Sequence, residues 1–273
     1  MTIFSLDTDH LVHFGRYGYV IIPNVVSRGI VRTILEYAIA NENLSKTPSL
    51  GPQSIWLNDI DVSHPLLSPF LKTSALNLAL SLINPHEFEF PLSVQLSSNV
   101  PPWSPPNLAP HIDGLTSRPE NIRPGTFTIL AAILLSNQEL CDSGNLWVWP
   151  GSHKANASFI NIHGSEKLIS TAPHPPVQLS EPVQIIGQPG DLLLAHYLLG
   201  HQSGRNLSDN IRYALYLRLR TKSHKAHWQK CISNAFFEFP RVREAIKSIN
   251  AVTFSAQCFN STAFPDGTRG EPS

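Results

Sequence analysis

The sequence has little charge and little cysteine, and it lacks any long apolar run. Its 273 residues carry 20 Lys+Arg and 20 Asp+Glu, so neither nucleic acid nor an anionic membrane is a predicted partner. No apolar run approaches the length of a membrane span, and residues 1–25 lack the order of a signal peptide. Cys141, Cys231 and Cys258 are too few and too far apart for a disulfide framework or a zinc quartet. We therefore expect a cytoplasmic protein whose partner is a small molecule.

Helical patterns predominate at the two ends of the chain. Apolar residues recur there at the spacing of an amphipathic helix, and Ser27 can cap one of these helices. The stretch YVIIP at 19–23 predicts a short buried strand that ends at its proline. We expect an N-terminal helical buttress over residues 8–83 and a C-terminal helical tail over residues 221–273, with 259–273 frayed. The predicted helices cover residues 8–16, 27–38, 65–82 and 224–249.

The middle of the chain is a series of predicted strands, separated by Gly, Pro and Asn turns. These strands cover residues 88–99, 126–136, 145–150, 182–187, 191–199 and 212–220. A parallel α/β sheet would need a helix between successive strands, and no convincing helical pattern lies between residues 88 and 220. The order predicts a mainly-β fold with flanking helices, a double-stranded β-helix or cupin-like jelly roll. We expect its core at about 88–220 within a single domain, 1–273.

A histidine and an aspartate stand two residues apart in NLAPHIDGLTS, residues 107–117. Side chains two apart in a strand point to the same face, so His111 and Asp113 can bind one cation. A lone His-x-Asp arises often by chance, but HYLLGHQSGRN offers His196 and His201 as third ligands. Two histidines and one carboxylate that leave positions open are the ligand set of non-haem iron(II) oxygenases.

An arginine, Arg212, stands on the predicted strand that follows His196 and His201. Arg212 lies eleven residues after His201, and a buried arginine there needs an anionic partner. The carboxylate of 2-oxoglutarate suits its planar guanidinium. Two alternatives stay open, a jelly-roll binding module with structural histidines and a cupin-type metalloenzyme with three histidines. Both leave Arg212 without a role.

In this order, these residues resemble the phytanoyl-CoA hydroxylase-like (PhyH) family of Fe(II)- and 2-oxoglutarate-dependent dioxygenases. FGRYGYVIIPNVVS (14–27) is similar to the family's N-terminal entry, and SGNLWVWPGSH (143–153) to its Gly-x-Leu-x-x-x-Pro-Gly-Ser-His segment. Residues 190–219 are similar to its distal metal strand and co-substrate strand, and the whole resemblance extends over roughly residues 10–220. It implies Fe(II) as cofactor, 2-oxoglutarate and O2 as co-substrates, and oxidation of a C–H bond.

The resemblance also implies a metal-binding set. His201 fits better than His196, because the family's distal histidine precedes x-Ser-Gly, here residues 202–204. His153 corresponds to a histidine that is structural in the family. Halogenating relatives lack a carboxylate at the position of Asp113, so its presence implies oxygenation. The implied iron ligands are His111, Asp113 and His201.

For the co-substrate, the resemblance implies that Arg212 holds the distal carboxylate of 2-oxoglutarate with help from the Ser203 hydroxyl. The sequence departs from the family at Leu146, where many relatives have a polar residue, and at Ala214, where some oxygenases have a serine. Another polar group must then help to hold the 1-carboxylate and keto end. Gln95, on the strand before the proline-rich loop, is the candidate, with an ordinary exposed glutamine as the alternative.

An oxidising iron centre has to be shielded from water, so we expect a closed and mostly apolar mouth. Residues 51–61, 101–113 and 114–125 can cover it, and prolines stiffen the second of these stretches. Arg118 and Arg123 can meet an anionic substrate or lie in water, and Trp147 or Trp149 can line the pocket or pack in the core. The candidate substrate residues are Trp56, Asn58, Trp103 and Arg118, each of which can also be an ordinary loop residue.

The sequence favours hydroxylation of a small, largely apolar metabolite, in specialised metabolism. Desaturation, epoxidation or oxidative rearrangement on the same scaffold are alternatives that the residues do not separate, and a protein hydroxylase is a further one. No feature fixes whether the protein is a monomer or a homodimer.

Overall fold

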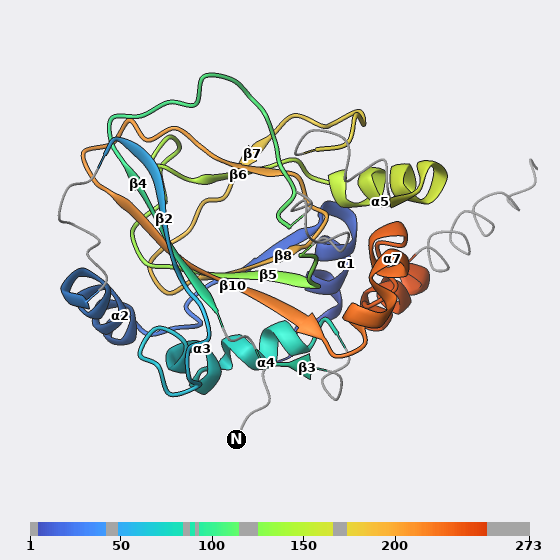
Figure 1. Cartoon of the computed structure of the whole chain (residues 1–273), viewed down its shortest axis with the longest axis horizontal. Helices are drawn as coiled ribbons and strands as arrows, with labels where there is room; N and C mark the ends of the chain where they lie inside the picture. The colour runs from blue at the N-terminus through green and yellow to red at the C-terminus, as the bar shows by residue number, and fades with distance from the viewer. Residues whose placement is uncertain are drawn as a thin grey trace, which may run out of the picture.

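The computed structural model describes residues 5–41, 49–83, 88–90, 93–114, 125–165 and 174–249. Two antiparallel sheets face each other, and helices cover the outer face of the larger sheet (Figure 1). This is the mainly-β, cupin-like jelly roll with flanking helices that the sequence predicts. Within the described residues, no helix combines the length and the apolar character needed to cross a membrane.

The larger sheet has the strand order β1-β8-β5-β10-β4-β2, with β3 paired to β10. All of these neighbours are antiparallel. The longest strand, β10, crosses the middle of the sheet, and Figure 1 shows the smaller sheet on one side of it and α3 and α4 on the other. The strands are β1 (Tyr19–Ile22), β2 (Gly51–Leu57), β3 (Phe88–Glu89), β4 (Val94–Val100), β5 (Ile129–Leu134), β8 (Leu192–His196) and β10 (Arg212–Thr221).

The smaller sheet consists of β7 (Val183–Gln184), β6 (Leu146–Val148) and β9 (His201–Ser203), in that order. A backbone bridge joins His111 to His201 at its edge. The His111 amide donates to the His201 carbonyl at 2.9 Å, and the His201 amide donates back at 3.1 Å. This pairing brings two segments together that are ninety residues apart in the chain.

Side chains along the strands of the larger sheet point alternately to its two faces, and each face packs into its own hydrophobic core. On β10, Leu215, Leu217 and Leu219 pack in the cluster beneath the helices, whereas Ala214 and Tyr216 belong to the cluster between the sheets. Even-numbered positions of β10 therefore face the space where a ligand can enter. The helices over the outer face are α1 (Thr8–Tyr17), α2 (Arg28–Asn41), α3 (Ser68–Lys72) and α4 (Ser74–Leu80).

The N-terminal helices follow the sequence prediction closely. Asp7 caps α1 by accepting a hydrogen bond from the His10 amide, and the Ser27 hydroxyl accepts one from the Ile30 amide at the start of α2. The helix predicted over residues 65–82 is two shorter helices. Thr73 has an extended backbone and ends α3, and its hydroxyl caps α4.

Two expectations were wrong. Residues 51–57, predicted as a loop, form the edge strand β2, because Ile55 and Leu57 pack towards the core while Ser54 and Trp56 point to the other face. A helix also lies where none was expected, α5 (Ser152–His163), after Gly151 in the left-handed region. The apolar residues of α5 form only a weak stripe along one face, so the spacing of apolar residues in the sequence does not predict this helix.

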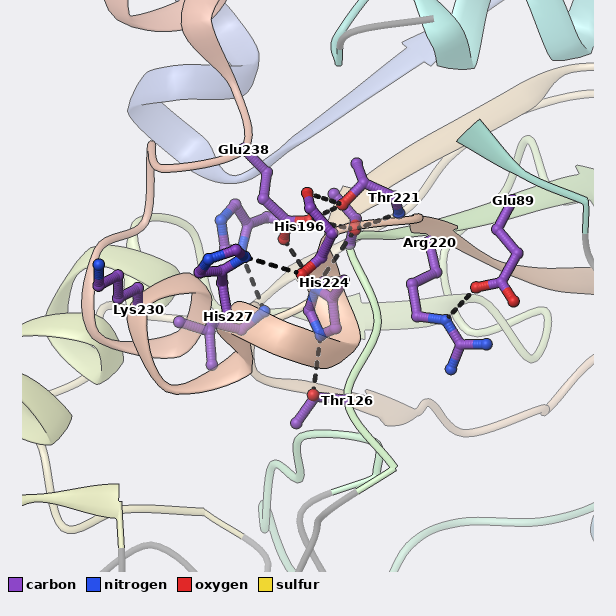
Figure 2. A network of polar contacts seen from close by, with 12 residues as sticks. Glu89, Thr126, His196, Arg220, Thr221, His224, His227, Lys230 and Glu238 are labelled. Atoms are coloured by element: carbon purple, nitrogen blue, oxygen red, sulfur yellow. Dashed lines mark hydrogen bonds and ion pairs between the residues drawn. The ribbon is translucent and has the colours of Figure 1, made fainter. Parts of the chain in front are cut away.

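A cluster of buried polar contacts, the C-terminal clamp, ties the last helices to the larger sheet (Figure 2). Helix α7 (His224–Ser233) begins directly after β10, and residues 240–249 are again helical. His224 Nδ1 lies 2.9 Å from Glu238 Oε2, and its Nε2 lies 2.8 Å from the Thr126 hydroxyl. The other carboxylate oxygen, Glu238 Oε1, accepts from Thr128 at 2.8 Å and from Thr221 at 2.6 Å.

Candidate active site

The predicted metal ligands meet at the edge of the smaller sheet. Their ligand atoms all lie within 4.8 Å of one another. His111 Nε2 is 3.4 Å and His201 Nε2 is 3.7 Å from Asp113 Oδ1. One carboxylate oxygen and two imidazole nitrogens thus converge on a single point, a donor set that suits a divalent iron ion. The backbone bridge between His111 and His201 produces this arrangement, because it places the two rings 4.4 Å apart, centre to centre.

The three groups have shifted pKa values. Burial raises the pKa of Asp113, but hydrogen bonds to His111 and His201 and the charge of Arg218 outweigh it, so the net shift is strongly downward. Burial also lowers the pKa of His111. For His201, burial lowers the pKa but Asp113 raises it more, and the net shift is upward. An ionised Asp113 and a neutral His111 are the forms that bind a metal ion.

The other candidate histidine lies outside this cluster. The backbone amide of Leu198 donates to His196 Nδ1 at 2.9 Å, and His196 Nε2 lies 2.8 Å from the Ala235 carbonyl. Burial lowers the pKa of His196 to about 4. His153 packs on the His196 ring at a centroid distance of 5.0 Å. Both rings are packing groups, so the geometry favours His201 as the distal ligand.

A cavity of about 200 Å³ opens between the two sheets beside the triad. Its lining is mostly polar. The apolar mouth that the sequence predicts stays a prediction, because residues 115–124 of its expected cover lie outside the described residues. The apolar side chains of β4 and β10 alternate with the polar ones and point to the opposite face, into the core. The lining residues are Pro52, Ser54, Gln95, Ser97, His111, Asp113, Leu130, Leu146, His201, Ser203, Tyr216 and Arg218.

Arg212 lies behind one wall of this cavity and is only 2% exposed. Its Nε donates to the Gly144 carbonyl at 2.7 Å, and its Nη1 donates to the Ser97 hydroxyl at 3.3 Å. Gly144 has a φ of +78°, and a Cβ there would come within 2.8 Å of Arg212 Cβ, which explains the glycine of the SGNLW segment. Among the described residues, no carboxylate pairs with Arg212. A buried cation of this kind calls for an anionic ligand.

The remaining predicted co-substrate residues also border the cavity. Ser203 and Leu146 face each other across the pair β6 and β9. Gln95 projects from β4, where its Nε2 donates to the Ser54 hydroxyl at 2.8 Å. Its Oε1 accepts a hydrogen bond from Arg218 at 2.9 Å. Because Leu146 is apolar, Ser203 and Gln95 are the candidates among the neutral polar lining residues for contact with the co-substrate.

Arg218 is a site residue that the sequence argument missed. Its Nη2 donates to Asp113 Oδ2, the carboxylate oxygen that faces away from the two histidines. Its guanidinium lies 4.3 Å from the ring centre of Trp56 on β2. The signal was present in the sequence, because positions 212, 214, 216 and 218 of one strand share a face.

Of the three predicted substrate residues that the structure describes, Trp56, Asn58 and Trp103, none lines the cavity itself. Trp56, however, stacks on its lining residue Arg218. The backbone of Trp103 bridges to Asn206, and its ring covers Gly51. Arg118 lies outside the described residues, as do Arg123 and residues 259–273. Neither Trp147 nor Trp149 lines the cavity: Trp147 has Arg205 over its ring at 5.9 Å, and Trp149 is buried.

A jelly roll with two histidines and an aspartate at one cavity, and a buried arginine behind its wall, is the arrangement of a non-haem iron oxygenase of the 2-oxoglutarate-dependent type. The sequence profile of the phytanoyl-CoA dioxygenase (PhyH) family matches residues 14–214. The chain belongs to this family and is an Fe(II)- and 2-oxoglutarate-dependent dioxygenase, as its resemblance implied. A search of curated protein sequences gives no significant match.

Solved structures with a similar fold are enzymes of the same type. HygX from Streptomyces hygroscopicus, with nickel and 2-oxoglutarate bound, superposes with a TM-score of 0.56 at 16% identity, covering 79% of this chain and 87% of that one. EctD from S. alaskensis, in its apoform, superposes with a TM-score of 0.55 at 19% identity, covering 79% of this chain and 77% of that one. The α-ketoglutarate-dependent epimerase SnoN from nogalamycin biosynthesis gives 0.53 at 18% identity, covering 78% and 81%. At these identities the likeness shows the fold.

Proposed function

We propose that this enzyme hydroxylates a C–H bond of a small molecule, with Fe(II) held by His111, Asp113 and His201. One observation carries the proposal: the buried guanidinium of Arg212 has no carboxylate partner among the described residues, and it lies behind the cavity wall, where it donates to the lining residue Ser97. Arg212 and the Ser203 hydroxyl are the proposed contacts of the distal carboxylate of 2-oxoglutarate. Gln95 is the proposed contact of its 1-carboxylate and keto end.

When bound, the iron and its co-substrates supply the oxidising power, and the protein supplies position and shielding. Asp113 offers Oδ1 to the metal while Oδ2 accepts a hydrogen bond from Arg218, which fixes the plane of the carboxylate. His201 Nδ1 lies 2.9 Å from the Leu199 carbonyl, so Nε2 is the nitrogen left for the metal. Leu130 and Tyr216 also line the cavity, and their side chains take up space that water would otherwise fill.

The substrate is proposed to be a small metabolite. The sequence favoured a largely apolar one, but the polar lining of the cavity supports a molecule that also carries polar groups. HygX has been solved with hygromycin B bound and EctD with 5-hydroxyectoine, both small molecules rich in polar atoms. Specialised metabolism and a cytoplasmic location remain parts of this proposal, and desaturation, epoxidation or rearrangement would use the same triad and co-substrate.

The test is the binding of 2-oxoglutarate to the iron-loaded protein without oxygen. The wild type should develop a weak metal-to-ligand absorption band in the visible region, and Arg212→Ala should need a much higher 2-oxoglutarate concentration for the same band. Arg220→Ala is the matched control, because Arg220 lies on the same strand but pairs with Glu89 at 2.8 Å. Bound iron without any band in the wild type would contradict the proposal.

A further inference from the structure

We infer that Arg218 binds an acidic group of the primary substrate, so that the enzyme acts on a small organic acid. This inference rests on the proposed function, and it names the class of molecule that the function requires. The residues that carry it are Arg218 itself and the aromatic side chains on either side of it, Trp56 and Phe127.

The guanidinium of Arg218 is held in place, but only one of its three nitrogen atoms donates hydrogen bonds to described residues. Both hydrogen bonds that it makes with described residues come from Nη2, to Asp113 and to Gln95. Nε and Nη1 make none within the described part of the chain. The ring centres of Trp56 and Phe127 lie 4.3 and 5.6 Å from the guanidinium carbon, and the side chain is 19% exposed. A planar cation stacked in this way keeps its free donors in fixed directions, and each of them can donate a hydrogen bond to a carboxylate oxygen.

The charges of the loaded site leave Arg218 without a full counter-charge. Dianionic 2-oxoglutarate and Asp113 bring three negative charges, while divalent iron, Arg212 and Arg218 bring four positive ones. Asp113 balances Arg218 only as long as it does not share its charge with a metal ion. One positive charge is then in excess in a partly buried cavity, where its solvation by water is poor. A substrate with one acidic group restores neutrality.

Arg218 cannot share the co-substrate's distal carboxylate with Arg212. The two residues are six positions apart on β10, which separates their backbones by about 20 Å at the usual rise of a strand. Arg212 adjoins Ser97 beside Gly144, whereas Arg218 adjoins Asp113 and the edge strand β2. The two arginines therefore meet different carboxylate groups. Trp56, which is 47% exposed, offers a flat apolar surface to the body of the molecule whose acid meets Arg218.

The experiment compares acids with their amides on the iron-loaded protein without oxygen, at saturating 2-oxoglutarate. The probes are 4-fluorophenylacetate with 4-fluorophenylacetamide, and 6-fluorohexanoate with 6-fluorohexanamide. Broadening of the fluorine signal by the paramagnetic iron reports binding near the metal. We expect at least one acid to bind about tenfold more tightly than its amide, which corresponds to about 1.4 kcal/mol. Arg218→Met should abolish this preference and Arg218→Lys should keep part of it.

Arg220→Met is the matched control and should keep the wild-type preference. Equal affinity of acid and amide in the wild type, including no broadening by either, overturns the inference, whether or not the Arg218 variants fold. A preference that survives in Arg218→Met also overturns it. The absorption band with 2-oxoglutarate is recorded on the same samples. A band lost only in Arg218→Met follows from the loss of its hydrogen bond to Asp113, and Arg218→Lys then decides: no preference for the acid in an Arg218→Lys sample that keeps the band overturns the inference. A band absent from the wild type would contradict the proposed function.

Discussion

Replacement of Glu238 by glutamine should destabilise the fold strongly, because Glu238 is the centre of the C-terminal clamp. Its side chain is 7% exposed and accepts hydrogen bonds from two threonines in addition to its contact with His224, which is itself 1% exposed. Hydrogen bonds to a buried charged group contribute roughly 1.5–3 kcal/mol each. Glutamine still offers one carbonyl oxygen to the threonines, so we expect the loss of about one such bond, about 2–3 kcal/mol.

The assay is equilibrium unfolding in urea at neutral pH, with Glu89→Gln as the matched control. Glu89 pairs with Arg220 and Lys225 at a much more exposed position, where such pairs contribute about 0–1 kcal/mol. The midpoint should fall far more for Glu238→Gln than for Glu89→Gln. Equal midpoints for the two variants would refute the conclusion that the buried clamp stabilises the fold.

The pH dependence gives a second check of the same contact. Burial raises the pKa of Glu238, but hydrogen bonds to His224, Thr221 and Thr128 lower this pKa by more than burial raises it. The net shift is downward. A carboxyl whose pKa is lower in the folded state stabilises the fold above its unfolded pKa and loses this contribution as the pH falls. The difference between the wild type and Glu238→Gln should therefore shrink in acid. A difference that grows as the pH falls would contradict this assignment of charge.

Three further predictions concern the metal, the co-substrate and the core. His111→Ala or Asp113→Ala should abolish iron binding, measured by metal analysis, and 2-oxoglutarate consumption, while circular dichroism stays like that of the wild type; normal consumption would exclude the triad. Arg212→Met should raise the KM for 2-oxoglutarate by about 10- to 100-fold with iron still bound, since a charged hydrogen-bond partner contributes about 1.5–3 kcal/mol; an unchanged KM would move the anchor elsewhere. Leu215→Ala, at a fully buried position, should lower the unfolding free energy by about 2–5 kcal/mol without changing iron affinity; a loss below 1 kcal/mol would show that the site repacks.

Much of the fold could be predicted because its strands have clear apolar patterns and its turns have clear glycine and proline signals. The meeting of His111, Asp113 and His201 could be predicted because these three ligand residues stand at short or family-specific spacings, and Arg212 follows at a family-specific distance on the next strand. Strand β2 could not be predicted this way. It is an edge strand with one neighbour, and the face that carries Ser54 and Trp56 needs no apolar residues. Apolar and polar residues therefore alternate only weakly along it.

The role of Arg218 depends on contacts between distant segments. Asp113, Gln95 and Trp56 lie on three different elements, and only the fold brings them to one guanidinium. Along the strand, Arg218 and Arg220 look alike, two arginines with the same spacing. What separates them is that one meets the ligand carboxylate and the other meets Glu89. Charge patterns identify a cation, but they do not say which anion it meets.

The position of β2 at the edge of the larger sheet has a consequence for how this enzyme can change over evolutionary time. Its outward face carries Ser54 at the cavity wall and Trp56 on Arg218, while its inward face holds Ile55 and Leu57 against the core. Substitutions at Ser54 and Trp56 alter the surface that a substrate meets, yet they disturb few packing contacts and cost little stability. New substrate preferences can therefore arise on one strand while the metal centre and the interior stay intact.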